Sequence, residues 1–465
     1  MFYLGFIGVL MFVLLVLSFI RKSVLLDKVM KVLSILFMLL MFINVLLPDG
    51  FVVSLSEEEL AGNNQYFEAI IRWFRFVSFL VIPIAVFYDK KIFNKIAIYF
   101  CLPIAVVNLI SYFLYFPDIT TSNLKGIANI RFFSEGFRIF ISNDVFRSCF
   151  FGLISLLEIV ILIYIVYKNN QKLKFESIKE SILFIITLIS LILVIMPIYI
   201  PQYLIGYTDI ILKTYSLAHL MWVLSLVVIF IGLHLIFRKQ TYENRFILVI
   251  VLALSLLIQY NQMFSAINEL TFKRMPLQLC NIGSYLILVT LLTKNRKLFS
   301  FTLIVNVVGA LVALSILGVD EKGLGYLWNM HYILEHSGVV IIPLLCLSLG
   351  LFPKVEKEDI KYVLIGFISY FIFVLGLGTY LNGIFASTGN DFFEVNYLFM
   401  FDREVAADAI GFADKLFDLK IIIGKYTYYP MIQSVVFFTF LSLCFGVFYL
   451  LYFLTNLKYK KSNIS

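Results

Sequence analysis

The sequence has few charged residues, few histidines and no closely spaced cysteines. The scarcity of charge and the spacing of the cysteines each exclude a class of protein. Only 14% of the 465 residues are charged, whereas 62% are hydrophobic. Soluble domains have about 25% charged and about 45–50% apolar residues, so an ordinary soluble protein is excluded. The five cysteines contain no C-x-x-C spacing, which indicates neither a zinc site nor a disulfide framework. Only four histidines occur, and all of them lie in the second half of the chain.

Apolar segments of membrane-spanning length are abundant instead. A helix that crosses a bilayer needs about 20 mostly apolar residues. The sequence therefore predicts an all-α fold, a polytopic membrane helix bundle of about 13 transmembrane helices. The predicted spans are 2–20, 30–48, 69–88, 94–116, 146–167, 180–200, 214–237, 246–262, 276–293, 298–318, 331–352, 360–381 and 432–456.

The distribution of positive charge predicts the orientation of this bundle. The net charge is +8, and most lysines and arginines fall in short loops on one side of the predicted spans. This side is expected to face the cytoplasm, which puts the N-terminus outside and the C-terminus inside. The abundance of Phe, Tyr, Ile and Lys is typical of an AT-rich bacterial gene. We therefore expect a multi-pass protein of a bacterial plasma membrane, with membrane lipids as partners and no binding to nucleic acid.

The chain also shows a weak internal repeat. Residues 71–93 align without gaps to residues 277–299, and both segments contain a span, a short basic turn and a second span. The surrounding spans follow the same order, which predicts a tandem duplication with six helices in residues 1–205 and seven in residues 206–465. The alternative is that two strings of apolar helices look alike without a common origin.

Polar groups inside a bilayer are costly and mark functional sites by default. His219, Cys280 and His336 would all lie roughly 7–10 Å below the outer ends of their helices, at a rise of about 1.5 Å per residue. A thiol beside an imidazole is a nucleophile with its base. We therefore predict that Cys280 and His336 are catalytic. The residues predicted to bind substrate around them are His219, Gln278, Asn281, His331, Glu335, Asn382 and Asn396.

The supporting roles within this pocket stay open. Glu335 or a neighbouring amide is a candidate to orient the imidazole, and Asn281 or Gln278 is a candidate oxyanion donor. Interhelical hydrogen bonding is the alternative for the histidines, and apolar packing is the alternative for Cys280 and the expectation for the other four cysteines. A three-histidine zinc site lacks a supporting H-E-x-x-H spacing, so no metal and no cofactor are expected.

The first half carries different polar residues and lacks the cysteine–histidine pair. Arg72 and Arg75 flank Trp73 near the outer end of a predicted span, where snorkelling to lipid phosphates is expected. Glu158 falls in the middle of a span. It is either a proton or cation site, or a protonated group hydrogen-bonded to a neighbouring helix. Residues 1–205 are therefore predicted to be a degenerate repeat without the Cys/His centre.

Four short motifs succeed one another in the second half. They are residues 215–220 (YSLAHL), 275–280 (MPLQLC), 336–338 (HSG) and 396–399 (NYLF). In their order and spacing they resemble the YwaF-type integral membrane family, which is related to animal transmembrane protein 164. The resemblance covers about residues 210–455 and implies a seven-helix domain with a cysteine–histidine centre.

This resemblance also implies a chemistry, because the animal relative is linked to acyl transfer on phospholipids with a cysteine as nucleophile. Carried over by position, it identifies Cys280 as the nucleophile and His336 as the base. The sequence departs from the family at Gln278, where a histidine usually stands two residues before the cysteine. That departure moves the role of the base onto His336.

Two classes of function follow from these observations. The first is a membrane-embedded acyltransferase or lipid ester hydrolase that acts near the outer leaflet through Cys280 and His336. The second is a non-enzymatic transporter or lipid-binding protein that uses the same polar pocket. A coupled transporter would carry deep charged residues on several helices, and only Glu158 has that position.

Overall fold

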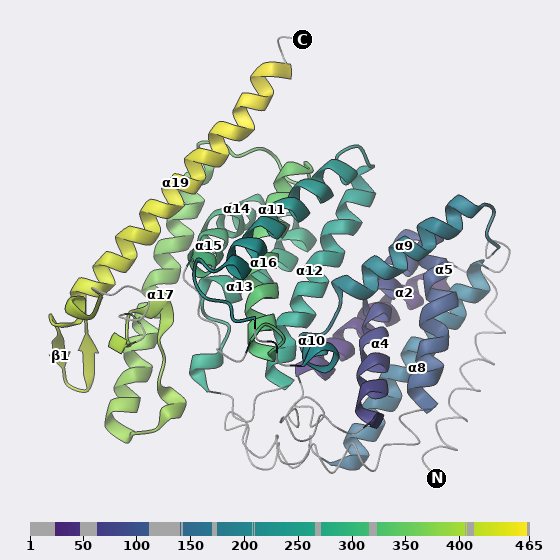
Figure 1. Cartoon of the computed structure of the whole chain (residues 1–465), viewed down its shortest axis with the longest axis horizontal. Coiled ribbons are helices and arrows are strands. Elements are labelled where there is room, and N and C mark those ends of the chain that lie inside the picture. The colour runs from purple at the N-terminus through teal and green to yellow at the C-terminus, as the bar shows by residue number, and fades with distance from the viewer. Residues whose placement is uncertain are drawn as a thin grey trace. The chain divides into compact units, whose positions relative to one another are not determined.

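The computed structural model describes residues 24–46, 63–110, 140, 143–169, 174–206, 208, 210–265, 271–315, 323–404, 406 and 413–462 (Figure 1). The chain divides into two compact units. The first contains residues 1–206 and 261–269, and the second contains residues 207–260 and 270–465. The predicted helix at residues 2–20 lies outside the described part of the chain.

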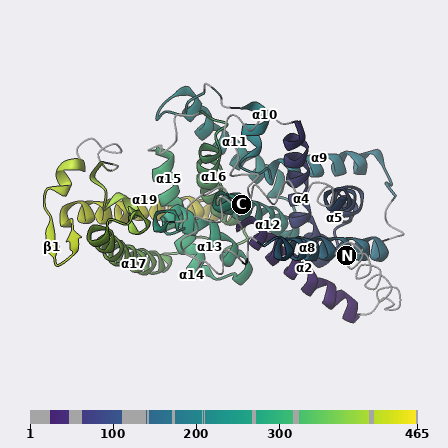
Figure 2. The ribbon, with the colours of Figure 1, turned by 90° about the horizontal axis from the view of Figure 1, so that it is seen from below.

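The first unit is helical throughout its described residues. Helix α2 packs on both α4 and α8, and α9 contacts α4 and α5 (Figures 1 and 2). Its elements are α2 (Val24–Leu46), α4 (Asn63–Tyr88), α5 (Lys91–Ile96), the π-helix η2 (Ala97–Cys101), α8 (Asp144–Asn169), α9 (Ile178–Val194) and α10 (Ile200–Ile205).

The second unit is built around α13 and α16, which pack against each other and against α15. Its α- and π-helices are α11 (Leu217–Phe237), α12 (Tyr242–Ser265), α13 (Leu279–Thr293), α14 (Arg296–Phe301), the π-helix η5 (Thr302–Asn306), α15 (Val307–Ser315), α16 (Leu327–Ser348), α17 (Asp359–Thr388) and α19 (Pro430–Ser462). Its short elements are the 3₁₀ turns η4 (Phe272–Arg274), η6 (Asp391–Phe393), η7 (Tyr397–Phe399) and η8 (Ala413–Phe417), and an antiparallel hairpin of β1 (Ile421–Ile423) and β2 (Tyr426–Tyr428).

Ten helices of the described chain are long and apolar enough to cross a membrane. Helices satisfy their backbone hydrogen bonds internally, which a lipid environment requires. The predicted all-α polytopic bundle is therefore confirmed as a class, whereas the count of thirteen and the orientation stay predictions. Two predicted spans are shorter than expected: α9 has 17 residues and α13 has 15.

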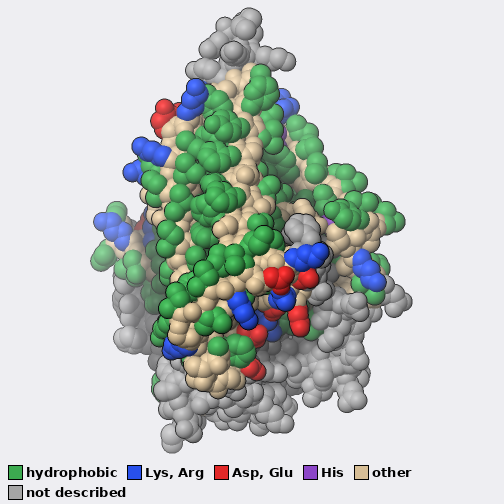
Figure 3. Space-filling view, turned by 90° about the vertical axis from the view of Figure 1, so that its left-hand side faces the viewer, with side chains coloured by type: hydrophobic (Ala, Val, Ile, Leu, Met, Phe, Trp, Pro, Cys, Tyr) green, Lys and Arg blue, Asp and Glu red, His purple; other side chains and the backbone are tan. Residues whose placement is uncertain are grey.

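The helices differ in how much apolar surface they leave uncovered. In the most apolar 18-residue stretch of each helix, only 11% of the residues of α11 and 17% of those of α19 are buried, against 89% in α12. The face that carries α17 and α19 is covered by hydrophobic side chains, with charged side chains at its margins (Figure 3). Such a large apolar surface is unsuited to water, as is typical of helices that cross a membrane.

Both units contain the same feature where two helices are joined by a tight turn. Asp89 and Lys294 have left-handed backbone conformations in the turn, with φ of 48° and 53°. A π-helix follows at Ala97–Cys101 in one unit and at Thr302–Asn306 in the other. Asp89 and Lys294 are 205 residues apart, and so are the first residues of the two π-helices, Ala97 and Thr302. The gapless sequence alignment pairs residues that are 206 apart.

The helix after this turn begins, in each unit, with a basic residue that pairs with two acids near the start of a later helix. The ion pairs are Lys91–Glu176 (2.7 Å) and Lys91–Glu180 (3.1 Å) in the first unit, and Arg296–Glu356 (2.9 Å) and Arg296–Asp359 (2.9 Å) in the second. The duplication stays a prediction, with which these shared features are consistent. In that interpretation, α4 and α5 correspond to α13 and α14.

Arg75 does not snorkel to the lipid surface, which corrects the expectation from the sequence. Its side chain is buried, and its Nε lies 3.3 Å from Oε2 of Glu158 on α8. The guanidinium also donates to Ser155 Oγ at 3.4 Å and lies 4.8 Å from the centre of the Phe151 ring. A buried charge needs a partner of opposite sign, and Glu158 provides it.

Candidate functional site

Cys280 lies in the first turn of α13, where two glycines allow close packing of helices. A Cβ atom on Gly309 of α15 would lie 2.6 Å from Cβ of Leu279. A Cβ atom on Gly283 would lie 3.0 Å from Cγ1 of Val339 on α16. Small residues permit such close approach between helices in membranes. The glycines thus hold the start of α13 tightly against α15 and α16.

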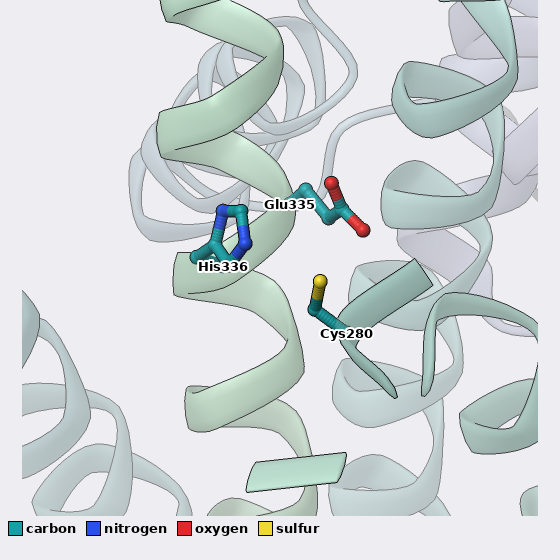
Figure 4. A group of neighbouring side chains, drawn as sticks. All are labelled: Cys280, Glu335 and His336. Atoms are coloured by element: carbon teal, nitrogen blue, oxygen red, sulfur yellow. The ribbon is translucent and has the colours of Figure 1, made fainter. Parts of the chain in front are cut away.

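Glu335 and His336 of α16 face Cys280 across this contact. The Cys280 Sγ, a carboxylate oxygen of Glu335 and a ring nitrogen of His336 all lie within 4.8 Å of one another (Figure 4). The Glu335 and His336 side chains are almost completely buried, and Cys280 is partly exposed. The structure therefore brings together the two residues that the sequence predicts to be catalytic, and adds a carboxylate to them.

A hydrogen bond fixes the proton of His336. Its Nδ1 lies 2.6 Å from the main-chain oxygen of Tyr332, one helical turn earlier. A carbonyl oxygen only accepts hydrogen bonds, so Nδ1 carries the proton of the neutral ring and Nε2 carries the free lone pair. The orienting group of the imidazole is thus a backbone carbonyl. Neither Glu335 nor a side-chain amide has this role.

Glu335 is oriented by a different histidine. Its Oε2 lies 3.4 Å from Nε2 of His331, which is one turn away on α16. Its Oε1 accepts no hydrogen bond from the described residues, and no described lysine or arginine forms an ion pair with it. The carboxylate therefore sits in the cluster without a fixed cationic partner.

The start of α13 presents backbone N–H groups to the site. First-turn N–H groups lack intrahelical acceptors and carry the positive end of the helix dipole. The capping residue, Gln278, makes no side-chain cap to them. The thiol donates to Asn281 Oδ1 at 3.1 Å. Asn281 was predicted to bind substrate or to donate to an oxyanion, and in this structure its side-chain oxygen accepts from the thiol.

Gln278 has a role that the sequence did not suggest. Its Nε2 donates to the main-chain oxygen of Asn396 at 3.0 Å, and its Oε1 accepts from the Leu398 N–H at 3.1 Å. Asn382 binds the same loop through both its Nδ2 and Oδ1, which pair with the main chain of Val395 at 2.9 and 3.1 Å. These amides hold the 395–398 loop beside the start of α13.

The same loop is closed by Asn396 and Tyr397. The Oδ1 of Asn396 accepts from the N–H groups of Phe401 and Asp402. The Tyr397 hydroxyl donates to the main-chain oxygen of Phe272 at 3.1 Å, and burial raises the pKa of this phenol to about 12. Asn382, Asn396 and Gln278 thus bind backbone groups in this structure, so they support the site as a loop anchor.

His219 is placed outside the Cys280 cluster. Its Nδ1 accepts from the Tyr215 N–H at 3.0 Å, and its Nε2 lies 2.8 Å from the main-chain oxygen of Leu314. Ser216 caps the start of α11 by accepting from the His219 N–H. Both ring nitrogens are therefore used to join the start of α11 to the end of α15. The YSLAHL motif encodes this helix start.

His331 lies among aromatic rings. Its ring centre is 5.3 Å from that of Tyr260 and 6.3 Å from that of Trp328. Arg274 lies over the ring of Trp328, with its Cζ 4.5 Å from the ring centre. The i,i+4 spacing of His331 and Glu335 is a local pattern from which their contact could have been predicted. No local pattern indicates the Tyr332 carbonyl or the two glycines.

The fold and this cluster define a class: a polytopic α-helical membrane protein in which a partly exposed thiol at the start of an apolar helix lies beside a buried imidazole and a buried carboxylate. Residues 214–452 match the TMEM164 family, and the chain belongs to that family. The resemblance inferred from the four motifs is thereby confirmed. No curated protein and no solved structure shows significant similarity to the chain.

Proposed function

We propose that the protein is an acyltransferase or lipid ester hydrolase whose nucleophile is Cys280. The observation that carries this proposal is the proximity of the thiol to a histidine with a free Nε2 lone pair. The sulfur and the imidazole lie within 4.8 Å, and the Tyr332 carbonyl holds the required tautomer. Both residues lie within residues 214–452, the part of the chain that matches the TMEM164 family.

The proposed chemistry proceeds through a thioester. Nε2 of His336 removes the thiol proton, and the sulfur forms a bond to the acyl carbonyl carbon of an ester. The carbon–oxygen bond to the leaving alcohol breaks, and His336 returns the proton to that oxygen. A second hydroxyl, from an acceptor lipid or water, then loses its proton to His336 and attacks the thioester. The thiolate leaves and recovers the proton.

The first turn of α13 suits the charged intermediate of each step. A tetrahedral intermediate carries negative charge on the former carbonyl oxygen, and preorganised N–H groups stabilise such a charge. Because Gln278 binds the 396–398 loop and makes no cap, the first-turn N–H groups of α13 have no side-chain acceptor there. They are the proposed oxyanion donors.

A lipid ester is the substrate class that fits the surroundings. Cys280 is partly exposed, and the bundle around it presents extensive apolar surface. An acyl chain can reach the thiol sideways from the bilayer, whereas a soluble substrate would have to cross an apolar surface. The predicted orientation puts Cys280 near the outer leaflet of a bacterial plasma membrane.

The test is to trap the acyl-enzyme. Purified full-length protein in lipid nanodiscs is incubated with phospholipids that carry an alkyne-tagged acyl chain. We expect a hydroxylamine-sensitive label on the Cys280 peptide by mass spectrometry, and no label in Cys280→Ser. Cys346→Ser is the matched control, because this buried cysteine of α16 lies outside the cluster. Bound lipid without any thioester would support the alternative, a lipid-binding or transport protein.

A further inference from the structure

Cys280, Glu335 and His336 offer three different donor atoms to one point. The thiol sulfur, the carboxylate oxygen and the imidazole nitrogen lie within 4.8 Å of one another. In Figure 4 the thiol of α13 points toward the two side chains of α16. In a tetrahedral zinc site, bonds of about 2.0–2.3 Å put ligand atoms about 3.3–3.7 Å apart. A contraction of about 1 Å, within the range of side-chain torsions, would bring the donors to such distances.

Two further observations point to a cation. The Oε1 of Glu335 is buried and has no hydrogen-bond partner among the described residues. No described lysine or arginine compensates its charge, in contrast to Glu158, which has Arg75. The second concerns His336, whose Nδ1 is held by a backbone carbonyl. Histidine ligands of metals characteristically donate their other ring N–H to a carbonyl or carboxylate.

The donor set selects the kind of cation. Thiolate and imidazole prefer Zn²⁺ and similar soft or borderline ions, whereas Ca²⁺ and Mg²⁺ require several oxygen ligands. His331 lies 3.4 Å from Glu335 and orients the carboxylate from the outer side of the cluster. Three protein ligands leave the fourth position of a tetrahedral ion to water.

We infer that Cys280, Glu335 and His336 form a Zn²⁺ site, and that Zn²⁺ bound there switches off the Cys280 nucleophile. The inhibitory part rests on the proposed acyl transfer, since a metal-bound thiolate and imidazole are withdrawn from the reaction. The binding part is independent of any enzymatic activity. Free protein would be the active form, and zinc would hold it in a reversible inactive state.

Metal binding is tested with the full-length protein in detergent micelles, with Co²⁺ as a spectroscopic probe and Zn²⁺ as competitor. We expect one Co²⁺ per chain, visible d–d bands of a tetrahedral ion and a near-ultraviolet sulfur-to-cobalt band. Zn²⁺ should displace the cobalt and should slow alkylation of Cys280 by a maleimide at least tenfold. The sulfur band should vanish in Cys280→Ser and persist in Cys346→Ser.

Glu335→Gln and His336→Gln separate this site from nonspecific binding. Each substitution should weaken Co²⁺ binding at least tenfold, while His234→Gln on α11 should leave it unchanged. Tryptophan fluorescence and the elution volume on size exclusion show whether each variant is folded. Absence of binding to folded wild-type protein, or cobalt binding that persists unchanged in Cys280→Ser, would overturn the inference.

The two proposals fail in different ways. A zinc-dependent block of Cys280 alkylation without any acyl-enzyme would retain the metal site and remove the proposed acyl transfer. An acyl-enzyme that forms at the same rate with and without Zn²⁺ would retain the proposed acyl transfer and remove the inhibitory role of zinc. If both hold, added Zn²⁺ should reduce thioester formation at least tenfold and EDTA should restore it.

Discussion

The buried glutamates of the two units have different partners, and the difference separates a structural ion pair from a reactive cluster. In the first unit, Glu158 of α8 contacts Arg75 of α4 at 3.3 Å. In the second unit, Glu335 of α16 lies beside Cys280 of α13, and it forms no ion pair with a lysine or arginine of the described residues. If the predicted duplication is aligned on the two helix turns, which are 205 residues apart, Arg75 corresponds to Cys280.

Each glutamate has one carboxylate oxygen that accepts no hydrogen bond from the described residues. The two sites therefore differ in the groups that surround the carboxylate. A guanidinium is always charged in proteins and compensates the carboxylate permanently. A thiol and two imidazoles change their charge or bind a ligand. The comparison teaches that a buried acid alone does not identify a site. The chemistry of its neighbours does.

The largest expected effect concerns the base that only the second unit has. His336→Gln should slow acylation of Cys280 by about 100- to 10,000-fold, the usual contribution of a general base. The rate is measured from single-turnover labelling with the tagged phospholipid. His234→Gln should retain the wild-type rate because His234 bonds to Ser348 away from the cluster. An unchanged rate in His336→Gln would contradict the assignment of the base.

The next effect breaks the ion pair of the first unit. Arg75→Met leaves Glu158 buried without a cation and should lower the free energy of unfolding by about 3–5 kcal/mol. Replacing both partners, as Arg75→Met with Glu158→Leu, should recover most of this loss, since no buried charge remains. Unfolding in mixed micelles is followed by tryptophan fluorescence. A double variant as unstable as the single one would show that the pair is not the cause.

A smaller effect is expected where the second unit packs most closely. Gly309→Ala puts a Cβ atom 2.6 Å from Cβ of Leu279, which forces α15 and the start of α13 apart. Overpacking of this kind costs about 1–3 kcal/mol and should also slow Cys280 acylation. Gly232→Ala on α11 is the matched control, because its Cβ would meet no atom within 4 Å. Equal stability of both variants would contradict the packing argument.

The smallest effect on stability is expected at Glu335. Glu335→Gln removes a carboxylate that has no fixed cationic partner, so the free energy of unfolding should change by no more than about 1 kcal/mol. The same fluorescence measurement compares its free energy of unfolding with that of Arg75→Met. A loss as large as that of Arg75→Met would erase the contrast between the two glutamates.

The sequence predicted the class of fold and the main members of the site because both depend on local properties. Apolar segments about 20 residues long form helices in lipid wherever they occur. The predicted common depth of Cys280 and His336 below the ends of their helices was wrong, because Cys280 lies in the first turn of α13 and His336 lies in the third turn of α16. The two shortened helices, α9 and α13, and the β1–β2 hairpin show where hydropathy alone loses precision.

Long-range pairings were not predictable in the same way. Arg75 was expected at the lipid surface because its neighbours on α4 suggest the outer end of a span. Its actual partner, Glu158, lies 83 residues away on another helix. Likewise, Gln278 looked like an oxyanion donor beside Cys280, yet its amide binds a loop about 120 residues later. No sequence period connects such positions.

What the sequence determined by itself was therefore a polytopic helical membrane protein with all four of its histidines in the second half. Hydropathy and residue composition are properties of single segments, so they can be read without knowledge of the tertiary contacts. Tertiary structure decided which buried groups meet: Arg75 with Glu158, and Cys280 with Glu335 and His336. These contacts arise only when helices pack, because the reach of a side chain is a few ångströms and its partner comes from a distant part of the chain.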